Sequence, residues 1–125
     1  MLARYKIHRG KLPQGVRLPD GVRQDTRKHT RHCLRPTDEI VTEYLNNPNA
    51  NSWLKFSAAY LTVIASRYAD DAAPFDELAG LASSEDVYIG CSCPTKNNPD
   101  VNHCHTVLAL KFMSERYPEL RVEFP

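Results

Sequence analysis

A segment of fifteen residues, from Cys91 to His105, holds most of the side chains in this chain that can do chemistry. It contains three of the four cysteines and two of the five histidines. Thiolates bind soft metal ions and attack electrophiles, and imidazoles bind metals or exchange protons near neutral pH. The segment therefore predicts where a functional site lies, and three interpretations of its chemistry compete.

The first interpretation is a metal site, and zinc is the ion that it favours. Structural zinc sites use four ligands in a tetrahedron, commonly as two close pairs of Cys or His. One residue separates Cys91 from Cys93, whereas two to four are usual in such pairs. The second pair comes ten residues further on. The predicted metal ligands are Cys91, Cys93, His103 and Cys104.

The second interpretation is thiol-based catalysis. Cys104 falls at the predicted start of a helix, where the helix dipole and the free N–H groups stabilise a thiolate. Cys91 falls at the end of a predicted strand, and an adjacent histidine could act as the base. The predicted catalytic residues are Cys91, Cys104 and His105. A phosphatase-type loop is excluded, because no arginine stands six residues after Cys91, Cys93 or Cys104.

The third interpretation needs no ligand. Free cysteine is among the most buried residue types, so Cys91 and Cys104 could be small core residues at a strand end and a helix start. Trp53 has a similar ambiguity, because it lies on the apolar face of a predicted helix, where core packing competes with ligand stacking. The clustering of five cysteines and histidines in one short segment favours a shared role over packing alone.

The elements around this segment predict one α/β domain over residues 1–125. Val87–Gly90 is a short apolar strand, and residues 105–117 follow a helical pattern, so the cysteine segment joins a strand to a helix. Ligands bind at the carboxyl ends of strands in open α/β sheets. The predicted fold is a three-layer, Rossmann-like domain with a small, mainly parallel sheet that is covered on both faces.

Periodicity and capping residues predict the remaining elements. Three further helices are expected over residues 37–45, 51–68 and 74–84. Thr37 is the expected N-cap of the first of these helices, and Asn51 or Ser52 that of the second. Two terminal strands, Arg4–Ile7 and Leu120–Phe124, are expected side by side. A turn at residues 20–21 could close a small hairpin.

The first 36 residues form a basic, loop-rich arm. They hold ten Arg or Lys and two Asp, a formal charge of +8, whereas the remainder carries −7. Such an arm can face phosphate groups, or it can pair with the acidic remainder of the chain. The residues predicted to bind a phosphate-bearing ligand, together with a helix N-terminus, are Lys96, Thr106, Arg31 and Arg35.

The overall composition indicates an ordinary globular protein, with 42% hydrophobic and 25% charged residues. No apolar run is long enough for a transmembrane helix, and the first residues lack the apolar region of a signal peptide. We therefore expect a cytoplasmic protein with reduced cysteines and no membrane partner. The sequence makes no prediction about its oligomeric state.

The run Val87-Tyr-Ile-Gly-Cys-Ser-Cys93, followed by Cys104-His-Thr-Val-Leu-Ala-Leu110, resembles the C-terminal half of domain-of-unknown-function family 488 (DUF488). In that family an apolar strand leads through a loop to a Cys-His-Arg or His-Asn-His motif that opens a helix. The similarity extends upstream to Trp53, Phe56, Tyr60, Leu61 and the segment Leu34-Arg35-Pro36. Thr106 replaces the family arginine, which removes an anion clamp, and Cys93 adds a thiol.

The resemblance implies a small α/β domain and says little about activity. The leading functional prediction is a domain that binds, and in one version processes, a phosphate-bearing ligand such as a nucleotide or nucleic acid at the Cys/His-rich site. Two alternatives are a zinc-stabilised binding module without catalysis and a thiol-dependent enzyme. Whether the chain is an enzyme is left open.

Overall fold

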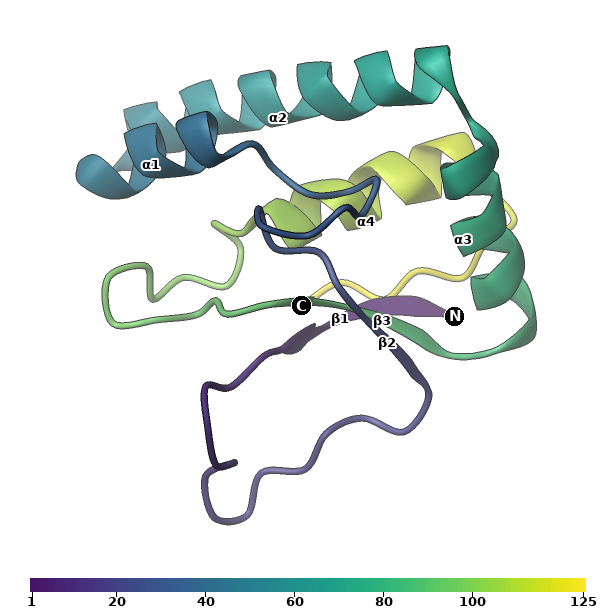
Figure 1. The fold of residues 1–125 in the computed structure, drawn as a ribbon, viewed down its shortest axis with the longest axis horizontal. Helices are drawn as coiled ribbons and strands as arrows, with labels where there is room; N and C mark the ends of the chain where they lie inside the picture. Colours follow the sequence, from purple (N-terminus) through teal and green to yellow (C-terminus); the bar gives the residue numbers. More distant parts are fainter.

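A computed structural model describes all 125 residues of the chain (Figure 1). Its strands are β1 (Leu2–Lys6), β2 (Val22–Asp25) and β3 (Val87–Cys91). Its helices are α1 (Asp38–Asn46), α2 (Ala50–Asp70), α3 (Ala73–Ser84) and α4 (His105–Arg116). None of the helices combines the length and the apolar character that crossing a membrane requires.

The three strands form one parallel sheet in the order β1-β3-β2. The central strand is the most buried, with Val87 and Ile89 both 0% exposed. Because all three strands run the same way, their carboxyl ends at Lys6, Asp25 and Cys91 meet at one edge of the sheet. The cysteine segment begins at that edge, where open α/β sheets bind their ligands.

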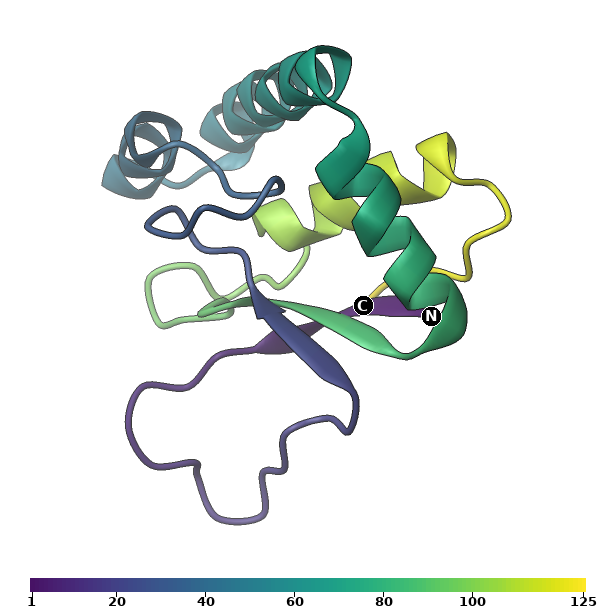
Figure 2. The same cartoon turned by 45° about the vertical axis from the view of Figure 1, so that its right-hand side comes forward.

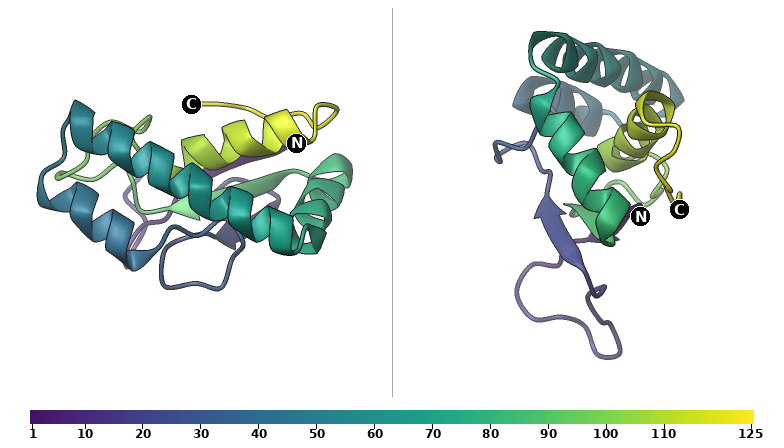
Figure 3. Two further views of the ribbon diagram at one scale, coloured as in Figure 1. Left: turned by 90° about the horizontal axis from the view of Figure 1, so that it is seen from above. Right: turned by 90° about the vertical axis from the view of Figure 1, so that its right-hand side faces the viewer.

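The helices stack on one side of this sheet (Figures 1 and 2). Helix α4 packs on the sheet, α2 packs on α4, and α1 runs beside α2. The predicted Rossmann-like α/β fold with a small parallel sheet is therefore confirmed. Its layers are sheet, helix and helix, so helices do not cover both faces as the sequence led us to expect. The loop of residues 7–21 projects away from the helices (Figure 3).

The hydrophobic core lies between the sheet and the helices. Tyr60, Ile64, Phe75, Leu110 and Met113 are each at most 1% exposed. The buried Tyr60 hydroxyl donates to the carbonyl oxygen of Leu34 over 2.6 Å, so its polar atom is satisfied inside the core. This contact ties the basic arm to α2, which packs on α4 behind the cysteine segment.

The predicted helices are present with small shifts at their ends. Thr37 caps α1, as predicted, with its side chain accepting from the Ile40 N–H. The predicted N-cap of α2, Asn51 or Ser52, is wrong. Asn49 caps this helix, because Asn49 and Ser52 form a reciprocal capping box.

Two predicted strand features differ from the structure. The hairpin is wrong, because residues 16–18 form no strand and β2 pairs in parallel with β3 instead. The predicted C-terminal strand is reduced to one bridge between Leu2 and Val122, although it does lie beside β1. Leu2 is the residue of β1 whose backbone bonds to this segment, donating to the Arg121 carbonyl oxygen and accepting from the Glu123 N–H.

Candidate functional site

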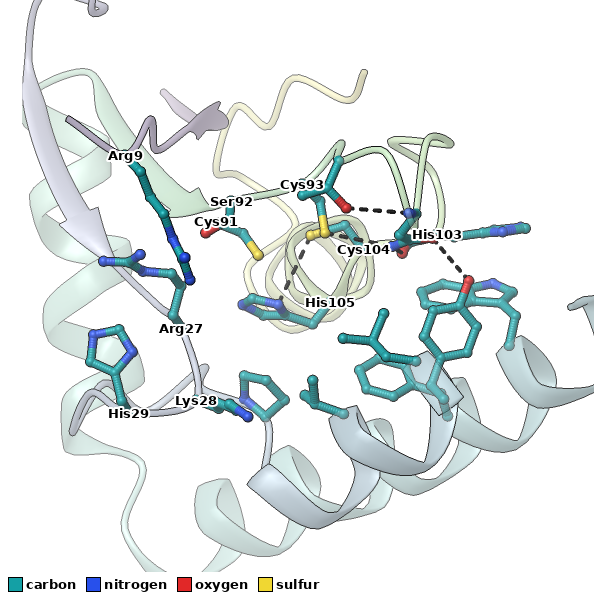
Figure 4. Close-up of a pocket in the computed structure, with 18 residues that line it drawn as sticks. Arg9, Arg27, Lys28, His29, Cys91, Ser92, Cys93, His103, Cys104 and His105 are labelled. Atoms are coloured by element: carbon teal, nitrogen blue, oxygen red, sulfur yellow. Dashed lines mark hydrogen bonds between the residues drawn. The ribbon is translucent and has the colours of Figure 1, made fainter. Parts of the chain in front are cut away.

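The carboxyl end of β3 and the amino end of α4 bring three of the four cysteines together (Figure 4). The Sγ atoms of Cys91, Cys93 and Cys104 all lie within 4.8 Å of one another. Cys91 ends β3, Cys93 stands in the following loop, and Cys104 is the N-cap of α4. The fold therefore places three sulfurs close enough to hold one metal ion.

Two of these three sulfurs accept a hydrogen bond from a neighbouring side chain. The Thr106 hydroxyl donates to Cys104 Sγ over 3.1 Å, and Asn98 Nδ2 donates to Cys93 Sγ over 3.5 Å. The Thr106 oxygen also accepts from Arg4 Nε over 2.9 Å, which leaves its hydroxyl proton available for Cys104 Sγ. No N–H or O–H in the structure donates to the third sulfur, that of Cys91.

The loop between Cys93 and Cys104 is held in place by Asn98. This side chain is 5% exposed, and its Oδ1 accepts from the Tyr44 hydroxyl over 3.0 Å. Its Nδ2 also donates to the His103 carbonyl oxygen over 2.7 Å. Asn98 therefore connects both ends of the loop to each other and to α1.

The close thiols change one another's ionisation. Hydrogen bonds from Cys104 and then from Cys91 lower the pKa of Cys93 to about 2. The same contacts, first with Cys104 and then with Cys93, raise the pKa of Cys91. For Cys104 the contact with Cys91 lowers the pKa, but the contact with Cys93 and burial outweigh it, so its pKa is raised. Deprotonation of one thiol in the metal-free cluster therefore makes deprotonation of its neighbours less favourable.

His105 lies beside the three sulfurs with its tautomer fixed. Its Nε2 is 2.9 Å from the Thr26 hydroxyl, and that hydroxyl donates to the Gly90 carbonyl oxygen over 2.9 Å. Nε2 must therefore carry the proton, and the lone pair is on Nδ1, 3.9 Å from Cys104 Sγ. Burial lowers the pKa of His105 to about 4, so the imidazole is neutral at pH 7.

His103, a predicted metal ligand, lies outside the sulfur cluster. Its ring stacks on Trp53 with a centroid separation of 4.9 Å and an interplanar angle of 24°. Trp53 also stacks on Phe56, with centroids 5.3 Å apart. The structure thus brings together three of the four predicted metal ligands and uses the ring of His103 to extend an aromatic wall.

A cavity of about 400 Å³ opens beside the sulfurs (Figure 4). This volume lies within the usual range of small-molecule sites. All three clustered cysteines line it, and no Asp or Glu does. Three cationic side chains line it, Arg9, Arg27 and Lys28, together with the imidazoles of His29, His103 and His105. Apolar and aromatic side chains also line it: Pro36, Val41, Tyr44, Leu45, Trp53 and Phe56.

Two of the three cationic side chains at the cavity already have acidic partners, and His29 Nε2 also lies 3.8 Å from Asp25 Oδ2. Arg27 binds the Asp25 carboxylate through two nitrogens, with Nη2 2.8 Å from Oδ2. Lys28 pairs with Asp38 of α1, which belongs to the acidic remainder of the chain. Arg9 makes no hydrogen bond or ion pair, so it is the cavity arginine whose charge is available to a ligand. The basic arm therefore both pairs internally and presents one open cation.

The residues predicted to bind phosphate are not gathered at this cavity. Lys96 and Arg31 are exposed, Arg35 donates to the His32 carbonyl oxygen, and none of the three lines the cavity. Thr106 is 0% exposed and already bonds to Arg4 and Cys104.

Sequence reasoning missed several residues that the structure places at the site. For Arg27, Lys28 and His29 a signal existed, because they belong to the basic arm and begin two residues after the last residue of β2. No local sequence pattern indicated Asn98, Arg4 or Arg9, because their roles depend on contacts between residues far apart in the sequence.

No protein-family model, curated protein or solved structure matches this chain. The resemblance to DUF488 stays a prediction, and the function has to be argued from the site itself.

Proposed function

We propose that this chain is a zinc-binding domain in which the thiolates of Cys91, Cys93 and Cys104 hold the ion. The observation that carries the proposal is the approach of three sulfurs to within 4.8 Å of one another at the carboxyl end of the sheet. Tetrahedral zinc with Zn–S bonds of about 2.3 Å needs sulfurs about 3.8 Å apart. Small side-chain shifts would bring the three sulfurs to that spacing.

The surroundings of the sulfurs support a charged metal–thiolate group. Zinc held by three thiolates carries one net negative charge. Arg4 donates to the Cys93 carbonyl oxygen over 2.6 Å and reaches Cys104 through Thr106, so its positive charge offsets that negative charge. Three protein ligands leave a fourth zinc position for water or a ligand, and all three sulfurs line the cavity from which it would come.

Elemental analysis of protein purified without a chelator or a nickel column tests the proposal. We expect about one zinc per chain, and strong thiolate-to-metal absorption when cobalt replaces zinc. Cys91→Ser and Cys104→Ser should each weaken metal binding. Cys33→Ser is the matched control, because Cys33 is a half-buried thiol outside the cluster. A cooperatively folded wild-type chain that binds no zinc would overturn the proposal.

We propose as a second function that the cavity binds a phosphate-bearing ligand. This proposal is supported by the basic side chains that line the cavity and by the absence of carboxylates from the lining. It is also supported by Arg9, whose charge has no partner in the structure. The cavity volume favours a nucleotide, whereas the exposed Arg23 and Arg31 of the arm favour nucleic acid.

Titration with inorganic phosphate, AMP and oligonucleotides at about 50 mM salt separates these ligands. AMP binding that exceeds binding of both phosphate and adenosine supports a nucleotide pocket. Oligonucleotide binding that weakens steeply with salt supports nucleic acid. If none of these ligands binds, the phosphate proposal fails and the zinc proposal is unaffected.

We also propose distant membership of DUF488 and a cytoplasmic location. The order of β3, the cysteine loop and α4 supports the former, and four unpaired cysteines support a reducing compartment. Homologous sequences that align with both this chain and DUF488 would test membership, and imaging of a tagged chain would test location.

A further inference from the structure

We propose that Cys91 is the nucleophile of this site and that, with zinc bound, its thiolate attacks a soft carbon electrophile that carries an anionic group. The inference rests on the proposed zinc site and goes beyond it by assigning different roles to the three sulfurs. Cys93 and Cys104 anchor the ion, and Cys91 reacts.

The hydrogen bonds separate Cys91 from the other two cysteines. Cys104 accepts from Thr106 and Cys93 accepts from Asn98, whereas no N–H or O–H donates to Cys91. A hydrogen bond to a thiolate stabilises its charge, and the nucleophilicity of a thiolate falls as its charge is stabilised. Bound zinc keeps all three sulfurs deprotonated. Among three zinc thiolates, Cys91 is therefore the strongest nucleophile.

The position of Cys91 also favours reaction there. All three cysteines line the cavity, but Cys104 is only 2% exposed, whereas Cys91 and Cys93 are half-buried, so exposure favours these two over Cys104. In Figure 4, Arg9 and Arg27 lie on the side of the cavity nearest Cys91. Because Arg27 is paired with Asp25 and Arg9 has no partner, Arg9 is the residue that would hold an anionic group near this sulfur.

The reaction needs no oxidant or reductant. A lone pair of Cys91 Sγ forms the new S–C bond while the bond from that carbon to its leaving group breaks. The leaving group departs with the bonding electron pair. No proton moves, because the attacking sulfur is already a thiolate. The product is a Cys91 thioether, whose sulfur is a weaker zinc ligand than a thiolate.

Competitive alkylation of the zinc-loaded full chain tests this inference, with zinc content measured on the same sample. Iodoacetate supplies an anionic electrophile, and iodoacetamide is its neutral counterpart. Peptide mass spectrometry should find Cys91 modified before Cys93 and Cys104. The rate ratio of iodoacetate to iodoacetamide at Cys91 should exceed that of free cysteine by about tenfold, since local cations concentrate anions.

Arg9→Gln should lower this ratio toward the value for free cysteine. Arg17→Gln is the matched control and should leave it unchanged, because Arg17 lies on the same exposed loop but does not line the cavity. First modification of Cys93 or Cys104, equal rates at all three sulfurs, or no preference for iodoacetate would each overturn the inference. Zinc-free protein would instead overturn the proposed zinc site, and this inference with it.

Discussion

Thr106 donates its hydroxyl proton to Cys104 Sγ across 3.1 Å. Its oxygen in turn accepts from Arg4 of β1, so a residue near the start of the chain supports a sulfur at the start of the last helix. Both side chains are held in place by the parallel pairing of β1 with β3 and by the packing of α4 on the sheet. Hydrogen bonds of this kind around a metal site commonly tune its affinity.

Replacing Thr106 with valine tests this support. Thr106→Val keeps the shape and removes the donor to Cys104, so zinc affinity should fall about 10- to 100-fold. Competition with a chromophoric zinc chelator measures the change. Thr62→Val is the control, because Thr62 is an exposed residue of α2 far from the sulfurs in sequence and on a separate element. Equal zinc affinity in the Thr106→Val variant and wild type would contradict the assigned hydrogen bond.

Asn98 should be more important for stability than its neighbour Asn97. Asn98→Ala removes bonds to Tyr44, Cys93 and His103 and leaves buried polar groups without partners, which should cost about 1–3 kcal/mol. Asn97→Ala alters an exposed residue of the same loop and should change stability little. Urea unfolding of the two metal-free variants compares them, and equal midpoints would show that Asn98 does not hold the loop.

Much of the site's location could be predicted from sequence, because strand and helix patterns are local. The apolar run at Val87 and the helical period after Cys104 placed the cysteine segment at the carboxyl end of a strand, as the structure has it. The grouping of the three sulfurs followed from that placement. His103 is different, because its stacking on Trp53 depends on how α2 packs on α4, which no local pattern encodes.

The ion pairs of the basic arm also could not be predicted from local sequence patterns. A charge count shows that the arm is basic, but the pairing of Lys28 with Asp38 depends on where the turn before α1 places both residues. The predicted hairpin failed for a related reason. Gly21, with φ of 133°, fits a turn, yet the strand that begins at the next residue, β2, pairs with β3, which lies far away in the sequence.

Neutralising single arginines of the arm should show which of them stabilise the fold and which are available to bind a ligand. Arg27→Gln breaks the two-nitrogen pair with the half-exposed Asp25, and we expect a stability loss of up to about 1 kcal/mol. Arg23→Gln is the control on the same strand, because Arg23 is exposed and makes no ion pair. Thermal unfolding compares them. If both variants unfold like wild type, the pair with Asp25 contributes nothing measurable, and Arg27 too is available for a ligand.

The stability of the metal-free chain should fall in mild acid because His105 is buried as a neutral imidazole. Burial lowers its pKa from 6.5 to about 4. Below pH 6.5 His105 becomes protonated in the unfolded chain but stays neutral in the folded chain. The free energy of unfolding therefore falls as the pH falls. The contribution of His105 is fully present above pH 6.5 and is lost progressively down to about pH 4, a total of about 3 kcal/mol. His32, whose pKa burial also lowers to about 4, acts in the same direction.

Urea unfolding with a chelator at several pH values between 7.5 and 4.5 isolates the part due to His105. His105→Gln should flatten the dependence of the free energy of unfolding on pH, whatever it does to stability at pH 7.5, because a group that cannot titrate cannot contribute to the slope. His8→Gln is the control, since His8 makes no hydrogen bond or ion pair, and it should keep the wild-type slope. The same slope in wild type and His105→Gln would show that His105 can take up a proton without unfolding the chain. Because the added proton would go to Nδ1, that result would contradict the burial of this nitrogen and leave the Nε2–H contact with Thr26 untouched.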